Sequence, residues 1–392
     1  MTLLRAYPTI SDLIHDVSGI YVPLPIHSFG FFVALAFVAA AWLLSLELRR
    51  KHRLGQIGAI KRTILLGEPP SPRELVVNGI VWFLVGFKII GGVLNYGACT
   101  ANPQAYIFSL EGSLLGGLAT GALAVWLRYR TKMKARLPQP KSQTVEVPPQ
   151  QLVGDLVVIA AVFGLIGAKL FHFLEQPSDL RYFLENPGEG LFSGLTIYGG
   201  LIIGTVAVVV WATKRRISVW HLGDAFGPAL MLAYAVGRIG CQISGDGDWG
   251  IPNPHDMPGW MSFLPEWLWA SDYSHNILNE GVPIPGCGEN HCHRLDPKVY
   301  PTPLYETLVC TTLFGVMWAA RKRIRIPGLM LALYMILNGL ERFFIEKIRV
   351  NVQYRWAGIE FTQAELISLL LIAGGLALGY WAFRKARNVK KP

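Results

Sequence analysis

Charged residues are scarce in this sequence. Asp, Glu, Lys and Arg make up 16% of the 392 residues, whereas hydrophobic types make up 52%. A soluble protein carries roughly 25% charged residues. Cysteine is scarce too, and 5 cysteines are too few for a disulfide framework. These shortages exclude a typical soluble domain and a disulfide-rich secreted domain, and they indicate a polytopic membrane protein.

Long apolar runs fill much of the chain. The run Phe29–Leu48 has close to the ~20 residues that a helix needs to cross a bilayer. We expect an all-α polytopic fold with about nine such helices, of which the third is short. The expected spans are Phe29–Leu48, Val76–Tyr96, Ser113–Leu127, Leu152–Leu174, Leu195–Ala212, Leu222–Ile243, Leu304–Ala320, Gly328–Ile345 and Ala364–Phe383.

The basic residues predict an orientation for these spans. Most of the 36 Lys and Arg residues fall in alternate connections, at 49–73, 128–141, 214–216, 321–325 and 384–391. Loops rich in Lys and Arg stay on the cytoplasmic side. The N-terminus is therefore expected in the periplasm and the C-terminus in the cytoplasm. The net charge of +10 then lies mostly at the cytoplasmic lipid surface, so we expect no nucleic-acid partner.

Two parts of the chain repeat each other in the same direction. Val85–Ile90 resembles Ile166–Phe171, and Leu114–Leu118 resembles Ile197–Leu201. Each copy then runs through apolar residues to a tryptophan and a basic cluster. Transporters more often use inverted repeats that cover half of the protein. We predict duplicated helical hairpins within residues 76–130 and 152–216.

Two of the segments that connect the expected spans are long and have a distinctive composition. The linker Pro138–Gln151 is rich in Pro, Gln and Lys, and we expect it to be flexible. Residues 244–303 contain many prolines and aromatic residues, and Trp and Tyr favour the membrane interface. We predict that 244–303 is a periplasmic insertion forming a compact cap. Residues 1–392 otherwise form a single transmembrane domain.

Ionisable residues at membrane depth are costly and mark candidate functional sites. Arg238 ends an apolar run and precedes a loop of glycines and carboxylates. Arg342, Glu346 and Arg349 are spaced to share one helical face. Guanidinium groups match phosphate oxygens, so a shared phosphate ligand and a purely structural network are both open from the spacing. Other such groups are interpreted as structural pairs or snorkelling side chains: Lys88, Asp155, Lys169, His172 and Asp224.

The predicted cap also holds a dense group of possible metal ligands. Cys287, His291, Cys292 and His293 lie within one short stretch. A structural zinc site usually draws on two separated ligand pairs, whereas an oxidising outer compartment favours a local disulfide. A disulfide, a metal site and neither remain open here. We assign no metal and no cofactor to the chain.

Several motifs occur together along the chain, at Ile26–Gly30, Gly194–Leu201, Gly237–Gly250, Pro301–Glu306 and Arg342–Arg349. They resemble the W-Y-G, G-G-x-x-x-H-G-G-L, G-R-x-G-N-F-x-N-G-E-x-W-G, H-P-x-Q-L-Y-E and F-R-x-x-x-E-x-x-R patterns of the prolipoprotein diacylglyceryl transferase family, in the family's order. One extra residue precedes the tryptophan of the third motif. The resemblance covers most of the chain.

The resemblance implies a multi-pass enzyme of the bacterial cytoplasmic (inner) membrane. It would transfer the diacylglyceryl group of phosphatidylglycerol to the thiol of a lipobox cysteine in a prolipoprotein, forming a thioether and releasing glycerol phosphate. Its partners would be phosphatidylglycerol, prolipoprotein signal peptides and membrane lipids. Cations are needed where the phosphate departs, and the thiol, with a pKa of ~8.5, must lose its proton.

The resemblance also assigns roles to individual residues. The expected catalytic residues are Tyr198, Arg238, Asp246, Arg342 and Glu346. The expected substrate-binding residues are Phe29, Gly30, Gly199, Gly200, Gly240, Gly245, Tyr305, Glu306 and Arg349.

Some residues depart from the family pattern. Tyr198 replaces a histidine, and a tyrosine with a pKa of ~10 is a poor base that can still donate a hydrogen bond to phosphate. Cys241 and Ser244 replace two asparagines, and Asp246 replaces a glutamate. A carboxylate therefore has to supply the base, and the candidates are Asp246, Asp248, Glu306 and Glu346.

These departures leave an alternative function open. The chain could be a paralogue that binds anionic phospholipid or transfers a glycerolipid group to another acceptor. A transporter is a third interpretation. The same-direction repeat argues against it, and so does the expected position of Arg238 and Arg342 near the outer ends of their spans. Copy two of the repeat carries Tyr198, where copy one has Leu115. We therefore expect copy two to be the working hairpin and copy one to be an added arm.

Overall fold

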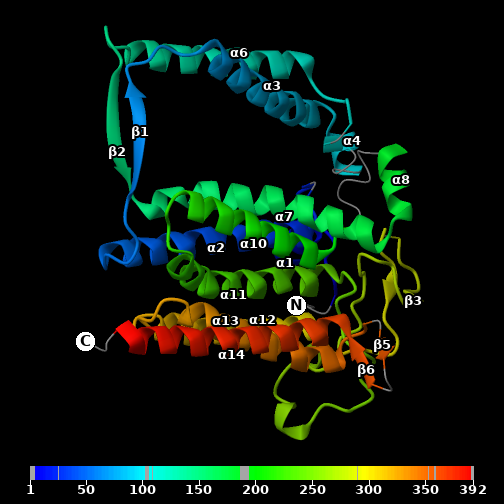
Figure 1. Cartoon of the computed structure of the whole chain (residues 1–392). Coiled ribbons are helices and arrows are strands. Elements are labelled where there is room, and N and C mark those ends of the chain that lie inside the picture. Colours follow the sequence, from blue (N-terminus) through cyan, green and yellow to red (C-terminus); the bar gives the residue numbers. More distant parts are fainter. Residues whose placement is uncertain are drawn as a thin grey trace. The chain divides into compact units, whose positions relative to one another are not determined.

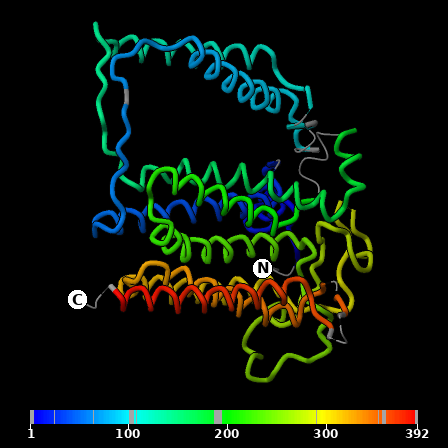
Figure 2. The backbone as a smooth tube through the Cα atoms, in the orientation of Figure 1, coloured from blue at the N-terminus to red at the C-terminus, as the bar shows by residue number. Residues whose placement is uncertain are grey.

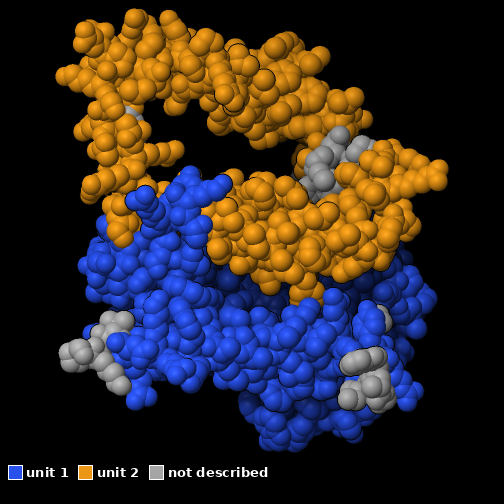
Figure 3. Space-filling model, in the orientation of Figure 1, with its two compact units in different colours: residues 1–57, 212–392 blue, residues 58–211 orange. Residues whose placement is uncertain are grey.

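The computed structural model describes residues 5–24, 26–101, 106–107, 109–185, 194–288, 290–351, 353–356 and 359–389. It is mostly helical (Figure 1, Figure 2). The chain divides into two compact units, coloured separately in Figure 3. Unit 1 comprises Met1–Ile57 and Ala212–Pro392, and unit 2 comprises Gly58–Trp211.

Unit 1 is organised around helix α11 (Val219–Ser244). Three helices pack against α11, and α14 packs against α13 (Figure 1). Small residues on the buried face of α11, among them Ala225, Gly227 and Ala229, let its neighbours approach closely. The three partners of α11 are α2 (Ser28–Arg53), α12 (Thr302–Ala320) and α13 (Leu329–Ile345), and α14 comprises Gln363–Val389.

The core of unit 1 lies between α11, α12 and α13. Met231 and Ala235 of α11 meet Cys310 and Met317 of α12 and Met330 of α13 in one buried cluster. Flexible methionine side chains fill irregular gaps between helices. This packing fixes the three helices whose ends carry the charged residues described below.

Asp224 has a structural role within α11. Its carboxylate accepts hydrogen bonds from the N–H groups of Gly328, Met330 and Leu331 at 3.0, 3.0 and 3.1 Å. These groups belong to the beginning of α13, where the first turn of a helix leaves N–H groups unpaired. The Nζ atom of Lys51 lies 3.6 Å from the same carboxylate. The pairing agrees with the structural interpretation of Asp224.

Residues 244–303 contain little regular structure but have a hydrophobic cluster of their own. Trp249, Tyr273, Leu295 and Val299 are buried together. The short elements here are η2 (Gly259–Met261), η3 (Glu266–Leu268), β3 (Val282–Pro283) and β4 (His293–Arg294), and β3 pairs with β4. Elsewhere in unit 1 are α1 (Ile10–Ser18), η4 (Glu346–Ile348), and the antiparallel pair β5 (Gln353–Trp356) and β6 (Ile359–Thr362).

Unit 2 contains a long antiparallel ribbon. Strand β1 (Ile60–Leu66) pairs with β2 (Lys141–Val147), from Ile60 opposite Val147 to Leu66 opposite Lys141. The prediction of a flexible linker at Pro138–Gln151 is therefore wrong. Its β-branched residues favour a strand, and β1 provides the partner. The ribbon brings the two ends of the first hairpin together.

The remaining elements of unit 2 form two helical hairpins. They are α3 (Pro72–Leu94), α4 (Tyr96–Ala101), α6 (Leu114–Lys134), η1 (Pro149–Leu152), α7 (Val153–Glu175), α8 (Ser178–Glu185) and α10 (Ile197–Lys214). An equivalent backbone hydrogen bond occurs in both hairpins. The N–H of Ser113 donates to the carbonyl of Phe87 at 2.9 Å, and that of Thr196 donates to the carbonyl of Ala168 at 3.1 Å.

The two lysines of the repeat also bind backbone. Lys88 donates to the carbonyl oxygens of Tyr106 and Glu111, at 2.7 and 2.8 Å. Lys169 lies 3.5 Å from the carbonyl oxygen of Gly194. In each hairpin the lysine thus ties the first helix to the connection that follows it, as the structural interpretation of these lysines expects.

Each range expected to cross the membrane coincides with a helix. Among the residues that the structure describes, 5 helices are long and apolar enough to cross a bilayer by length and composition: Ser28–Arg53, Pro72–Leu94, Pro149–Glu175, Ile197–Lys214 and Gln363–Asn388. The chain is thus a multi-pass membrane protein, and the total of nine spans and their orientation stay predictions. The all-α expectation is corrected in one respect, because the described residues include three two-stranded sheets.

Candidate active site

The candidate site is built where α11 and α13 end and α12 begins, all within unit 1. Gly245 ends α11 with a positive φ of 61°, a conformation that glycine adopts without strain. The chain then turns back, and the N–H of Gly250 donates to the carbonyl of Tyr300 at 2.9 Å. This contact sets the loop Asp246–Trp249 beside the first residues of α12.

Glu306 is the buried centre of the site. Its side chain has no exposed surface. Its Oε1 atom accepts hydrogen bonds from Tyr234 at 2.8 Å, Arg342 at 3.1 Å and Arg349 at 3.3 Å. Its Oε2 atom lies 2.9 Å from Nε of Arg238. One carboxylate therefore holds three arginines, and a buried charge needs such partners.

Asp248 binds two of these arginines from the other side. Its Oδ2 pairs with Nη1 of Arg238, and its Oδ1 pairs with Nη2 of Arg349. The Asp248 side chain is 35% exposed, against 11% for Arg238 and 6% for Arg349. The Thr302 hydroxyl donates to the backbone carbonyl of Asp248 at 2.8 Å. Asp248 is thus the outermost charge of the network.

Glu346 completes the network beside Arg342. Its Oε2 lies 3.2 Å from Nη2 of Arg342, and its Oε1 accepts from Asn351 at 2.6 Å. Arg342, Glu346 and Arg349 were expected to share one face of a continuous helix. The helix ends at Ile345 instead, and Arg349 is extended and pairs with Gly250 in a β-bridge. The bridge brings Arg349 to the site.

Asp246 and Cys241 lie next to Asp248. The N–H of Asp248 is 3.4 Å from Oδ1 of Asp246, and Sγ of Cys241 is 3.6 Å from Oδ2 of Asp248. Burial raises the pKa of Asp246, and the charge of Asp248 adds to this effect. Burial also acts to raise the pKa of Asp248, but Arg238 and Arg349 outweigh it and lower that pKa.

The same three residues have the spacing of a metal site. One possible ligand atom from each of Cys241, Asp246 and Asp248 lies within 4.8 Å of the others. Asp248, however, is already neutralised by Arg238 and Arg349. The guanidinium groups of Arg238 and Arg349 disfavour a further cation beside Asp248, because like charges repel at short range. The cluster is therefore a poor site for a metal ion.

Other predicted site residues of unit 1 shape the surroundings. A Cβ atom on Gly240 would lie 2.9 Å from Cβ of Phe32, so α11 and α2 pack tightly there. Tyr305 donates to the carbonyl of Trp269 at 3.3 Å. In the part of the chain that the structure describes, no hydrogen bond or ion pair joins the arginines to five of the predicted residues. These are Phe29, Gly30, Gly240, Gly245 and Tyr305.

Tyr198, Gly199 and Gly200 lie at the beginning of α10 and belong to unit 2. A Cβ on Gly199 would be 2.4 Å from the carbonyl oxygen of Gly167, and one on Gly200 would be 2.9 Å from that of Gly164. Both glycines are therefore required by the close packing of α7 and α10. Their expected contact with substrate stays a prediction.

Two members of the network were absent from the predicted site. Tyr234 precedes Arg238 by one helical turn on α11 and shares its ligand Glu306. The four-residue spacing from Arg238 was a usable signal for this tyrosine. Asp248 was considered only as a possible base, although the extra residue before Trp249 places a second carboxylate in the loop.

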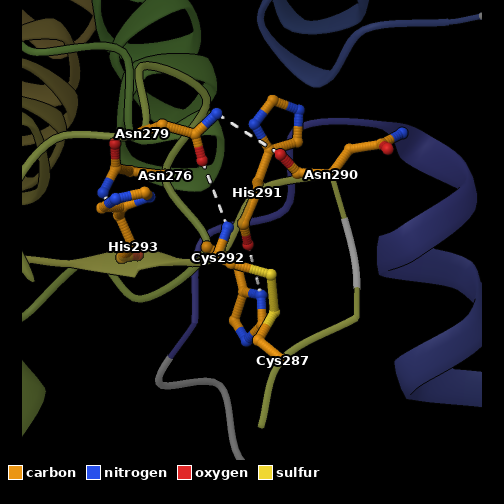
Figure 4. The surroundings of a disulfide bond; sticks show 8 residues. Asn276, Asn279, Cys287, Asn290, His291, Cys292 and His293 are labelled. Atoms are coloured by element: carbon orange, nitrogen blue, oxygen red, sulfur yellow. Dashed lines mark hydrogen bonds between the residues drawn. A yellow bond between two sulfur atoms is a disulfide. The ribbon is translucent and has the colours of Figure 1, made fainter. Parts of the chain in front are cut away.

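The dense ligand group in residues 244–303 contains a disulfide between Cys287 and Cys292 (Figure 4). Asn279 accepts the N–H of Cys292 at 3.1 Å and donates to the carbonyl of Asn290 at 3.3 Å. The disulfide alternative is therefore confirmed. With both sulfur atoms bonded to each other, neither is free to bind a metal ion.

Comparisons with known proteins place these residues in a family context. The family model described as prolipoprotein diacylglyceryl transferase matches residues 134–381. The phosphatidylglycerol–prolipoprotein diacylglyceryl transferase of Corynebacterium glutamicum is 27% identical over 272 residues, which cover 68% of this chain and 77% of that protein. Proteins of the same name are 28% identical in Symbiobacterium thermophilum (59% and 78% covered) and in Staphylococcus aureus (57% and 71% covered).

The matched range separates the two hairpins of unit 2. Residues 134–381 include α7, α10 and the whole arginine network, but not α3. The hairpin that carries Tyr198 therefore falls inside the family match, whereas residues 76–130 precede it.

Proposed function

The chain belongs to the prolipoprotein diacylglyceryl transferase family, and from this we propose that it transfers the diacylglyceryl group of phosphatidylglycerol to a prolipoprotein. The acceptor is the thiol of the lipobox cysteine in the signal peptide. One observation carries the proposal beyond family membership. Arg238, Arg342 and Arg349 all contact the buried carboxylate of Glu306. Arg238 and Arg349 also contact Asp248, whose side chain is partly exposed.

The arginines suit the departing phosphate. Guanidinium groups bind phosphate oxygens through paired hydrogen bonds, and fixed cations stabilise charge that grows in the transition state. Arg238 and Arg349 are nearest the exposed edge, because both contact Asp248. Arg342 supports them from the buried side through Glu306. We assign Arg238 and Arg349 to direct phosphate contact.

A carboxylate has to accept the thiol proton. The raised pKa of Asp246 makes it a better proton acceptor than Asp248, whose pKa is lowered. The thiol proton passes to Asp246, and the sulfur then forms a bond to the glycerol carbon. The bond between that carbon and the phosphate oxygen breaks, and glycerol phosphate leaves with the electron pair. Glu306 and Glu346 are fully buried and paired, which supports a positioning role.

The disulfide supports the proposed orientation. Disulfides persist in oxidising compartments and are rare in the bacterial cytoplasm. Cys287 and Cys292 lie in residues 244–303, the segment that follows the end of α11 that carries Arg238. We propose that this end faces the periplasm of a bacterial inner membrane, with nine spans. The distribution of Lys and Arg supports the same orientation.

The direct test is a transfer assay. The purified protein in nanodiscs containing phosphatidylglycerol is incubated with a lipobox peptide, and mass spectrometry detects the thioether-linked lipid. We expect product from the wild type and none from Arg238→Ala. Arg355→Ala is the matched control, because that side chain is 75% exposed and lies outside the network. Absence of product from the wild type, where a relative succeeds in the same assay, would overturn the proposal.

A second candidate function rests on the departures from the family pattern. Tyr198, Cys241 and Ser244 stand where the family motif has a histidine and two asparagines. They favour a paralogue that binds anionic phospholipid or uses another acceptor. Complementation of a bacterium depleted of its own transferase separates the two candidates, because rescue requires prolipoprotein modification.

A further inference from the structure

We propose that the Asp248 carboxylate occupies the position of the substrate phosphate, and that the lipid phosphate binds by displacing it from Arg238 and Arg349. Asp248 then determines how tightly phosphate is held and how readily the product leaves. This inference rests on the proposed function and assigns Asp248 a role in it.

The first support is the way in which Asp248 is bound. Its two oxygens contact two different guanidinium groups, Oδ2 at Arg238 and Oδ1 at Arg349. A phosphate diester also presents two non-bridging oxygens, which share one negative charge, and guanidinium N–H groups donate to carboxylate and phosphate oxygens alike. A site that holds this carboxylate between two arginines therefore has the donors that a phosphate needs.

The second support is the difference between the two carboxylates that these arginines share. Glu306 contacts Arg238 and Arg349 from the buried side and has no exposed surface. Asp248 contacts them from the exposed side, with 35% of its side chain accessible. When Asp248 leaves, Glu306 still holds both arginines in place. An incoming anion meets a prearranged pair of cations and does not have to organise them.

The third support is the anchoring of the Asp248 backbone. Thr302 donates to its carbonyl oxygen at 2.8 Å, and Gly250, two residues later, is tied to Tyr300 at 2.9 Å. The side chain can therefore swing away by rotation about its own bonds while the loop stays in place. Side-chain rotamer changes of this kind are fast compared with turnover. The exchange needs no movement of the helices.

The exchange has a consequence for product release. The phosphate diester of the lipid carries one negative charge, as Asp248 does, whereas the released glycerol phosphate carries up to two. A dianion beside two arginines would leave slowly. The returning Asp248 carboxylate competes for the same donors, since like charges cannot share them at low cost. Asp248 thus weakens the binding of both lipid and product.

The test compares Asp248→Asn with the wild type. Asparagine keeps the shape of the side chain and removes its charge. We expect glycerol phosphate to inhibit transfer, and to stabilise the protein against heat, at concentrations at least about tenfold lower in the variant. The KM for phosphatidylglycerol should fall in parallel, and kcat should fall because product leaves slowly. Asp256→Asn is the matched control, because it removes an exposed aspartate from the same segment.

The probes separate the sources of phosphate. Glycerol phosphate and inorganic phosphate report on the free anion, and nanodiscs with phosphatidylglycerol or with diacylglycerol report on the lipid with and without its phosphate. Unchanged or weaker anion binding in a folded Asp248→Asn protein would overturn the inference. Asp248→Ala serves if the asparagine variant misfolds, and failure of both to fold would show a purely structural residue. If the wild type transfers no lipid, the proposed function fails, whereas the heat-stability measurement still decides whether anions exchange with Asp248.

Discussion

Glu306 and Arg238 form a buried ion pair in which Oε2 of the carboxylate lies 2.9 Å from Nε of the guanidinium. The pair joins the beginning of α12 to the end of α11. Because Glu306 also contacts Arg342 and Arg349, the three cations are fixed before any substrate arrives. Cations held in this way stabilise developing charge without having to reorganise during the reaction.

The substitution Glu306→Gln should therefore damage both stability and activity. The amide keeps the size of the side chain but leaves the charges of three buried arginines less compensated. Removing one partner of a buried pair typically costs about 3–5 kcal/mol. We expect a clearly lower Tm in detergent and a loss of transfer of about 100-fold or more, as for removal of an electrostatic stabiliser.

An exposed pair provides the control for this substitution. Glu360 lies 3.8 Å from Arg355, and the two side chains are 58% and 75% exposed. Exposed ion pairs contribute little to stability, so Glu360→Gln should keep the Tm and the transfer rate of the wild type. A Glu306→Gln protein that behaved like Glu360→Gln would show that the buried carboxylate does not hold the arginines.

The sequence predicted which residues belong to the site better than it predicted which of them contact one another. Arg342, Glu346 and Arg349 were found from their spacing, which periodicity can detect. Glu306 entered the predicted site only through the family resemblance, because nothing in its neighbourhood in the sequence shows that three arginines from other elements contact it. Contacts between residues 36 to 101 positions apart depend on how helices pack, and a single sequence does not display that packing.

The ribbon of unit 2 shows the same limit. Lys141–Val147 is polar and follows a proline-rich stretch, so composition indicated a flexible linker. The segment becomes a strand because Ile60–Leu66, far earlier in the chain, offers the matching edge. The glycines of α10 illustrate another ambiguity. Gly199 and Gly200 belong to a family motif, yet the close approach of α7 already explains why neither carries a side chain.

Tyr198 should act through its hydroxyl group if it contacts the substrate phosphate. Tyr198→Phe removes the donor and keeps the ring, and we expect transfer to fall by about 10-fold, the loss that follows removal of one hydrogen bond to a charged group. Tyr198→His restores the family residue and should keep activity. The control is Leu115→Phe, at the equivalent position of the other hairpin. Full activity of Tyr198→Phe in the peptide assay would show that the ring only packs.

Substitution of Asp246 should affect stability and activity in different ways. Burial raises its pKa, so folding favours its protonated form. The resulting contribution to stability is present below the pKa of the unfolded chain and is lost as the pH rises through the pKa of the folded state. Asp246→Asn removes this pH-dependent loss, so the variant should be at least as stable as the wild type at neutral pH.

Transfer by Asp246→Asn should nevertheless fall by about 100-fold or more, since a general base typically contributes that much. In the wild type, the rate should rise with pH through the raised pKa of Asp246, and this limb of the profile should be missing in the variant. Thermal unfolding and transfer rates over a pH series measure both effects. An unchanged pH profile in Asp246→Asn would assign the proton to another group.

The first hairpin should be dispensable for the reaction, because the family match begins at residue 134 and the arginine network lies in unit 1. Leu66 pairs directly with Lys141, so an Asn-Gly turn that replaces residues 67–140 can close the ribbon in its present register. The excision removes two expected spans, α3 and α6, and removal of an even number of spans preserves the orientation of the spans that follow.

We expect the shortened protein to insert and to transfer lipid at a rate close to that of the full chain. The same excision combined with Arg238→Ala should be inactive. An inserted and folded shortened protein without activity would show that the added arm takes part in substrate binding.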